Sequence, residues 1–141
     1  MEVDMSLKNT VLLYLVTLAI FFLIDMVWLG LVAKNFYRSQ LGEMLSPKVN
    51  WAAAILFYLL FIAGLQLFVI APALAGAGAL QALCRGALFG LIAYATYDLT
   101  NLATLKNWPL LVTVVDLAWG AVLGGAVSFL AALIGWRLFK S

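Results

Sequence analysis

Four apolar stretches dominate this chain, and each is long enough to cross a lipid bilayer as a helix. A spanning helix needs about 20 mostly apolar residues, and a backbone in lipid must satisfy its own hydrogen bonds, which favours helices. The sequence therefore predicts an all-α integral membrane protein, an antiparallel four-helix bundle forming one domain over residues 1–141. The predicted spans cover residues 9–32, 51–71, 86–103 and 109–136.

The composition agrees with lipid as the main solvent. Hydrophobic residues make up 67% of the chain and charged residues only 10%, whereas soluble domains carry roughly 25% charged residues. The net charge of +2 comes without a basic tract, and nucleic-acid binding needs clustered Lys and Arg. We therefore expect membrane lipid as a partner and no nucleic acid.

The connections predict how the spans are arranged. Residues 34–46 mix aromatic and aliphatic side chains with charged ones, which is typical of a short helix at the membrane interface. Ser46 and Pro47 look like the N-cap and first residue of the second span. The Ala- and Gly-rich residues 72–81 are expected to form a connection, and the short segment 105–108 indicates an antiparallel turn.

Four spans place both termini on one side of the membrane. The first stretch is a poor signal peptide, because Lys8 is its one basic residue and its apolar run is long. Positive charges divide evenly between the two sides, so they do not fix the orientation.

Three aspartates lie inside the predicted spans, at one depth. At 1.5 Å per residue, Asp25 and Asp98 lie about 12 Å and Asp116 about 10 Å below the same membrane face. Charge inside a bilayer is expensive, so such residues are functional-site candidates. Three carboxylates in one layer repel one another unless they are protonated, paired or bound to a cation. We expect at least one to be protonated at neutral pH if no cation is bound.

Helical spacing places these carboxylates on the faces that carry small residues. Asp98 shares a face with Gly86 and Gly90, and Asp116 shares one with Gly120 and Gly124. Small residues four apart mark close helix contact, so both faces should point into the bundle. The candidate ligand, proton or cation site comprises Asp25, Asp98, Asp116, Asn101, Tyr94, Tyr97, Trp28 and Trp119, with Lys34, Arg38 and Lys106 as counter-ions at its rim.

Each of these residues also has a structural interpretation. A single intramembrane aspartate can hold helices together, contributing about 0.6–2 kcal/mol. The tyrosines either donate to the carboxylates or orient a substrate, and the tryptophans either anchor the interface or stack on a ligand. The segments Asp25-x-x-Trp28 and Asp116-x-x-Trp119 are alike, through an inverted repeat or through convergence on one packing solution.

Known catalytic patterns are missing from the sequence. There is no histidine, which removes the commonest general base and transition-metal ligand. The one cysteine, Cys84, either packs as an apolar group or acts as a nucleophile, and it excludes an intramolecular disulfide. We expect no metal site and no cofactor, and the sequence leaves open whether the protein is an enzyme.

Several segments resemble a known family. They are residues 25–30 (DMVWLG), 36–37 (FY), 50–51 (NW), 97–104 (YDLTNLAT) and 116–120 (DLAWG). They resemble small bacterial predicted membrane proteins catalogued as domain of unknown function family 2177. The resemblance covers nearly the whole chain and is most specific in the segment Tyr-Asp-x-Thr-Asn. It implies a multi-pass protein of the bacterial inner membrane and brings no established activity.

Three classes of function stay open. The first is a membrane-embedded site that binds or processes a lipid or another apolar small molecule, in a pocket lined by Phe21, Tyr58, Tyr94 and Trp119. The second is a small proton- or cation-coupled carrier working as a homodimer. The third is a structural accessory subunit of a larger membrane complex.

Overall fold

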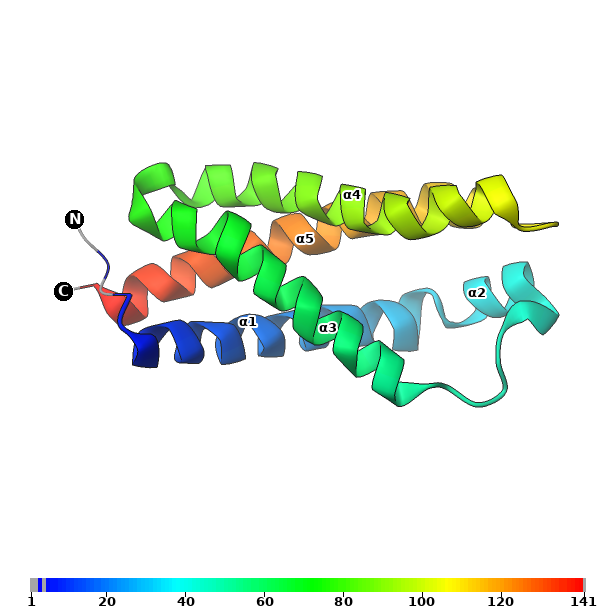
Figure 1. The fold of residues 1–141 in the computed structure, drawn as a ribbon, viewed down its shortest axis with the longest axis horizontal. Coiled ribbons are helices and arrows are strands. Elements are labelled where there is room, and N and C mark those ends of the chain that lie inside the picture. The colour runs from blue at the N-terminus through cyan, green and yellow to red at the C-terminus, as the bar shows by residue number, and fades with distance from the viewer. Residues whose placement is uncertain (1–2, 4, 141) are drawn as a thin grey trace.

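The computed structural model describes residues 3 and 5–140, and nearly all of them are helical (Figure 1). Four continuous helical stretches are long and apolar enough to cross a membrane, which confirms the all-α bundle predicted from the sequence. The elements are α1 (Leu7–Val27), η1 (Trp28–Val32), α2 (Lys34–Leu41), η2 (Gly42–Met44), α3 (Trp51–Leu65), η3 (Gln66–Ile70), η4 (Ala73–Ala77), α4 (Ala79–Thr104) and α5 (Leu110–Phe139). Of the η elements, η2 is a 3₁₀-helix and the others are π-helical.

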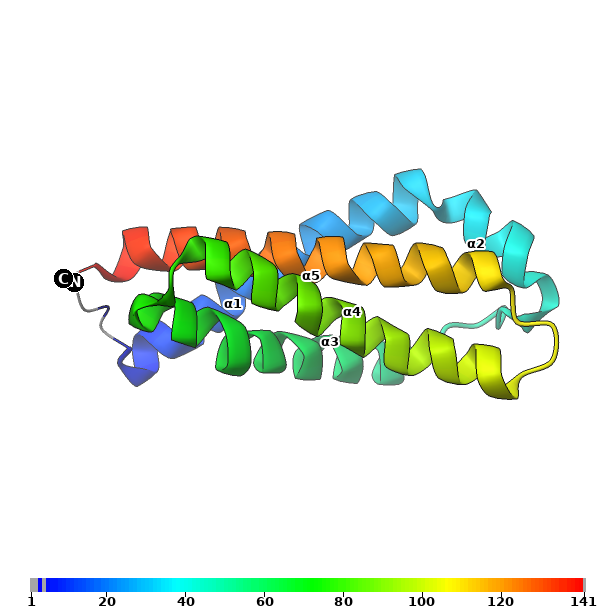
Figure 2. The same ribbon diagram turned by 90° about the horizontal axis from the view of Figure 1, so that it is seen from above.

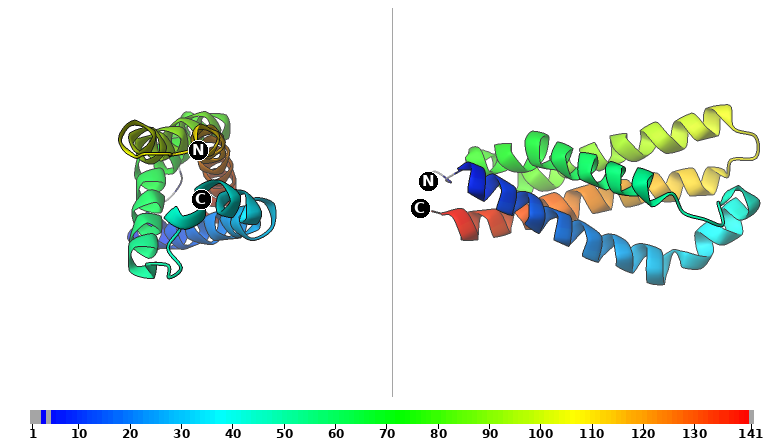
Figure 3. Two further views of the ribbon diagram at one scale, coloured as in Figure 1. Left: turned by 90° about the vertical axis from the view of Figure 1, so that its right-hand side faces the viewer. Right: turned by 60° about the horizontal axis from the view of Figure 1, so that its bottom comes forward.

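The helices run along one long axis, with α3 crossing the others at a slant (Figures 1 and 2). Val3 and Lys140 pair through an isolated antiparallel bridge, so the two ends of the described chain meet at one end of the bundle. The short helix α2 and the turn between α4 and α5 lie at the opposite end, as the second view in Figure 3 also shows. That end is the one near which the three aspartates lie.

The second connection is shorter than the sequence predicts. The second span continues to Ala77, and α4 begins at Ala79 rather than near residue 86. The reversal needs only Gly76 and Gly78, whose φ angles of 123° and 93° are readily adopted by glycine alone. The alanines around them are strong helix formers, so residues that looked like a loop form the last and first turns of two helices.

The start of α3 also differs from the prediction. Asn50 is its N-cap, and its side-chain oxygen accepts a hydrogen bond from the backbone N–H of Ala53 at 3.2 Å. The Ser46 hydroxyl is engaged earlier, in a local turn where it bonds with the backbone of Lys48. An Asn cap is worth about 1 kcal/mol, which favours starting the helix four residues after Ser46.

Glycines lie in the contact between α4 and α5, which is the most extensive between two helices of the described chain. A Cβ atom added to Gly120 would lie 2.7 Å from Cγ of Tyr94, and one added to Gly90 would overlap the backbone carbonyl of Gly120. Gly86 and Gly124 are matched in the same way one turn further along. Both glycine faces therefore point into the bundle, as predicted, and they pack against each other, which makes α4 and α5 one unit.

Candidate functional site

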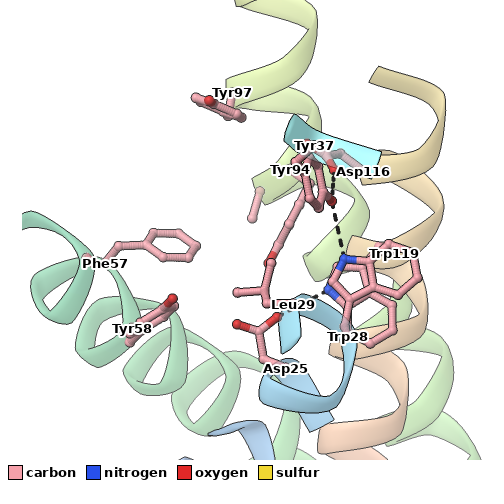
Figure 4. A pocket seen from close by; sticks show the side chains of 12 residues that line it. Asp25, Trp28, Leu29, Tyr37, Phe57, Tyr58, Tyr94, Tyr97, Asp116 and Trp119 are labelled. Carbon is pink, nitrogen blue, oxygen red and sulfur yellow. Dashed lines mark hydrogen bonds between the residues drawn. The ribbon is translucent and has the colours of Figure 1, made fainter. Parts of the chain in front are cut away.

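A cavity of about 360 Å³ lies among the helices near the α2 end of the bundle (Figure 4). Ligand cavities of proteins measure about 300–1,000 Å³, so the space suits a small ligand or part of a larger one. Twelve residues line it, and they come from all four spans and from α2. Seven of the twelve are aromatic and two, Asp25 and Asp116, are acidic.

Asp25 forms one acidic wall of this cavity. It lies near the end of α1, its side chain is only 3% exposed, and Oδ1 accepts a hydrogen bond from Nε1 of Trp119 on α5 at 3.3 Å. Its other oxygen turns toward the side of the cavity where Tyr58 lies (Figure 4). One oxygen is thus held by the protein while the other faces the space that a ligand would fill.

Asp116 forms the second acidic wall, and α2 completes its surroundings. The chain turns at the buried Ala33, so that α2 folds back toward α5 and brings the hydroxyl of Tyr37 onto Oδ1 of Asp116. The same hydroxyl accepts a hydrogen bond from Nε1 of Trp28 at 3.2 Å. Desolvation by burial, together with the neighbouring carboxylate, raises the pKa of Tyr37 well above its ordinary value. The phenol therefore stays protonated and acts as a donor.

The two Asp-x-x-Trp segments meet in a reciprocal arrangement. Trp28 and Trp119 stack face to face, with ring centroids 4.4 Å apart and planes 9° from parallel. The indole of Trp119 donates to Asp25 of the other segment, while the indole of Trp28 reaches Asp116 through Tyr37. Each tryptophan is thus linked by hydrogen bonds to the aspartate of the opposite segment, Trp119 directly and Trp28 through Tyr37. The two segments lie on antiparallel helices.

Asp98 is the most deeply buried of the three aspartates. It is fully buried on α4, and neither of its oxygens accepts a hydrogen bond from a donor among the described residues. Its carboxyl group lies within hydrogen-bonding reach of that of Asp116. Two carboxyl groups can bond to each other only when one carries a proton. A bond between Asp98 and Asp116 would therefore require the two acids to share a proton.

The remaining predicted residues lie around these carboxylates. Tyr94 and Tyr97 line the cavity, and the side chain of Asn101 interacts with the phenol of Tyr97 one turn away. The ring of Tyr97 also meets that of Trp108 edge to face, with centroids 5.6 Å apart. The predicted rim cations Lys34, Arg38 and Lys106 are all exposed, and the structure shows no ion pair from them to the aspartates.

Asp25 and Asp116 line one cavity, and Asp98 lies beside Asp116. Within the described residues, no group of three or more His, Cys, Asp or Glu side chains is arranged to hold a metal ion. The three carboxylates therefore share one region of the bundle without forming a common set of metal ligands.

Sequence reasoning missed some of the lining residues and misplaced one. The sequence predicts an interfacial helix around Tyr37 and gives no reason to select Phe57, yet both residues line the cavity. Phe21 was expected in the pocket but is fully buried in the core, where its ring packs against that of Tyr58 at 5.4 Å. Two signals in the sequence point to Tyr37: its polar hydroxyl, and its place in the segment 36–37 that resembles the family.

A known protein family matches most of the chain. No curated protein and no solved structure matches it. The family described as predicted membrane protein, domain of unknown function 2177 (DUF2177), matches residues 10–133, nearly the full length of the chain. With four candidate spans over the same residues, the chain belongs to this family of membrane proteins.

Proposed function

We propose that the protein binds a lipid or another apolar small molecule in this cavity, from within a bacterial inner membrane. The observation that carries the proposal is the lining itself, in which seven aromatic side chains surround two buried carboxylates at the depth of the membrane. Binding sites for small molecules are mostly apolar with a few placed polar groups. The aromatic rings would hold the apolar part of the ligand, and the carboxylates would engage its polar part.

Access to the cavity is expected from the side of the bundle. Phe57 on α3 and Tyr97 on α4 both line the cavity, and they are 43% and 55% exposed. At this position along the spans, exposed apolar surface faces lipid in a membrane. A lipid or an apolar molecule dissolved in the bilayer could therefore enter between α3 and α4 without crossing water.

Any chemical step would depend on the acids that line the cavity. Asp25, Asp116 and the tyrosines are the lining groups able to give or take a proton. Their arrangement is compatible with holding a polar head group, and it also permits acid–base assistance. Binding is the function that this geometry supports without a further assumption.

A pair of matched variants tests the proposal. Ala54 lines the cavity on α3, whereas its neighbour Ala53 is exposed on the lipid-facing side of the same helix. Ala54→Leu should fill part of the space, and Ala53→Leu should leave it unchanged. We would purify both variants with the parent protein, wash them, and quantify tightly bound lipids and small molecules by mass spectrometry. The proposal expects a bound species that Ala54→Leu alone depletes, and equal content in all three proteins would contradict it.

The pair of Asp98 and Asp116 favours a second candidate, a small proton-coupled carrier. A buried carboxyl pair that shares a proton can take up and release one during a transport cycle. The protein reconstituted in liposomes would then move a solute in response to a pH gradient, and Asp98→Asn would abolish the response. Solute flux that is equal with and without the gradient, measured across a range of solutes, would remove this candidate.

A further inference from the structure

The cavity holds acidic groups without a basic partner. Asp25 and Asp116 line it, and no Lys or Arg does so in the part of the chain that the structure describes. Just behind its wall, Asp98 is fully buried and both of its oxygens lack a donor. The indole of Trp119 donates to Asp25, and Asp116 accepts from Tyr37, but neither partner carries a positive charge. The acids of this site therefore have no counter-charge of their own, and a bound cation would supply one.

The aromatic lining suits the same kind of ligand. Faces of Trp and Tyr rings attract cations, and the attraction is stronger where water is excluded. The rings of Tyr58 and Tyr94 come from two different helices and lie around the space beside Asp25, whereas Trp119 turns its N–H edge toward this carboxylate (Figure 4). Aromatic faces combined with carboxylates bind ammonium groups, whereas phosphate and carboxylate ligands need basic side chains or N–H donors.

We infer that the ligand of this cavity carries a positively charged nitrogen, as an amine or quaternary ammonium group attached to an apolar tail. The inference rests on the proposed binding function and names the chemical class of its ligand. The charged group lies between Asp25 and Asp116, against the faces of the surrounding rings. The tail leaves the cavity past Phe57 and Tyr97 into lipid.

Three probes of equal chain length test the inference. Radiolabelled decyltrimethylammonium, decanol and decanoate are titrated separately into the protein held in nanodiscs of neutral lipid, and binding to empty nanodiscs is subtracted. The ammonium probe should bind at least about tenfold more tightly than decanol, a difference of about 1.4 kcal/mol. Decanoate should bind more weakly than both.

Matched variants locate the selectivity. Asp25→Asn and Asp116→Asn keep the shape of each side chain and an oxygen that can accept from Trp119 or Tyr37. Each should reduce the preference for ammonium over decanol severalfold while binding of decanol is kept. The control is Glu43→Gln, which removes an exposed carboxylate from η2 at the same end of the bundle and should change nothing.

The outcomes separate this inference from the proposed function. If decanol and the ammonium probe bind equally, or decanoate binds best, the ligand class is wrong while apolar binding in the cavity stands. If no probe binds above the empty nanodiscs and the purified protein also lacks a bound species, both fail. An ammonium preference that survives in both Asp→Asn variants but is lost in Glu43→Gln would assign it to surface charge and overturn the inference. Circular dichroism and size-exclusion profiles identify any variant that is misfolded, and Asp25→Glu, which keeps the charge, should then retain the preference.

Discussion

The two halves of the bundle are built on different principles. The α4–α5 half consists of two uninterrupted α-helices, Ala79–Thr104 and Leu110–Phe139, in backbone contact through glycines. In the other half, both spans change to π-helix, at Trp28–Val32 in the first and at Gln66–Ile70 and Ala73–Ala77 in the second. Turns of π-helix inside longer helices are frequent at functional sites.

The cavity adjoins only one of these π-helical segments, Trp28–Val32, through Trp28 and Leu29. The carboxyl pair Asp98–Asp116 is carried by the rigid half, so its geometry is fixed before any ligand arrives. The aromatic walls come largely from the irregular half and from α2, which the turn at Ala33 brings over the end of the cavity. A fixed polar group facing adaptable apolar walls suits a ligand with one defined head group and a variable tail.

The largest expected effect is on the contact between α4 and α5. In Gly90→Ala the new methyl group would overlap the carbonyl of Gly120, and backbone cannot move aside as a flexible side chain can. We expect a loss of about 3 kcal/mol in the free energy of unfolding, measured by denaturant titration in mixed micelles. The matched control is Gly30→Ala in the irregular half, where no atom lies within 4 Å of the added Cβ. Its effect should stay within about 0.5 kcal/mol, and equal losses in both variants would refute the comparison.

The next effect concerns the polar group that the rigid half carries. Asp116→Ala removes the acceptor of Tyr37 and leaves Asp98 buried without a partner. We expect it to destabilise the protein by about 2 kcal/mol, the usual range for a stranded buried polar group. Asp98→Asn should be tolerated within about 1 kcal/mol, because its amide can donate to Asp116 without a shared proton. If Asp98→Asn proves as damaging as Asp116→Ala, the two acids do not share a proton.

A smaller, pH-dependent effect should be seen at Tyr37, which ties α2 to the rigid half. Tyr37→Phe loses two hydrogen bonds and should cost about 1 kcal/mol at neutral pH. Because burial and Asp116 raise the pKa of Tyr37 in the folded protein, its contribution is complete below pH about 10, the ordinary value. It is lost as the pH rises above that value, since the unfolded chain then ionises first. Stability curves of the parent and Tyr37→Phe should therefore converge above pH 10, and parallel curves would show that Tyr37 is not buried against Asp116.

The smallest effect on stability is expected for the cavity itself. Ala54→Leu adds apolar atoms to an open space on α3, so the free energy of unfolding should change by no more than about 0.5 kcal/mol. A loss of about 2 kcal/mol or more, measured in protein stripped of lipid by detergent washing, would mean that no such space exists at Ala54.

Much of this architecture follows from local sequence rules. Long apolar runs predict the four spans, and the spacing of Gly86, Gly90, Gly120 and Gly124 predicts which faces of α4 and α5 meet. Depth counting puts Asp98 and Asp116 at one level, and the short turn between α4 and α5 fixes the register of the two helices that carry them.

Other features depend on contacts that are distant in the sequence. The path of α2 is decided by the single turn at Ala33 and by the bond from Tyr37 to Asp116, which lies 79 residues away. The π-helical turn that carries Trp28 and Leu29 has no signature in an apolar run, since every residue there suits α- and π-helix alike. Cavities are likewise hidden from sequence, because they arise where α3 diverges from its neighbours.

The central claim is that the space between the two halves holds a ligand. A cryo-electron microscopy structure of the protein in nanodiscs, extracted with its native lipids, tests this most directly. The account predicts α4 and α5 in glycine contact, with extra density beside Asp25 and Asp116 that continues past Phe57 and Tyr97 toward lipid. A structure in which α3 closes against α4 and the rings fill the space themselves would contradict it.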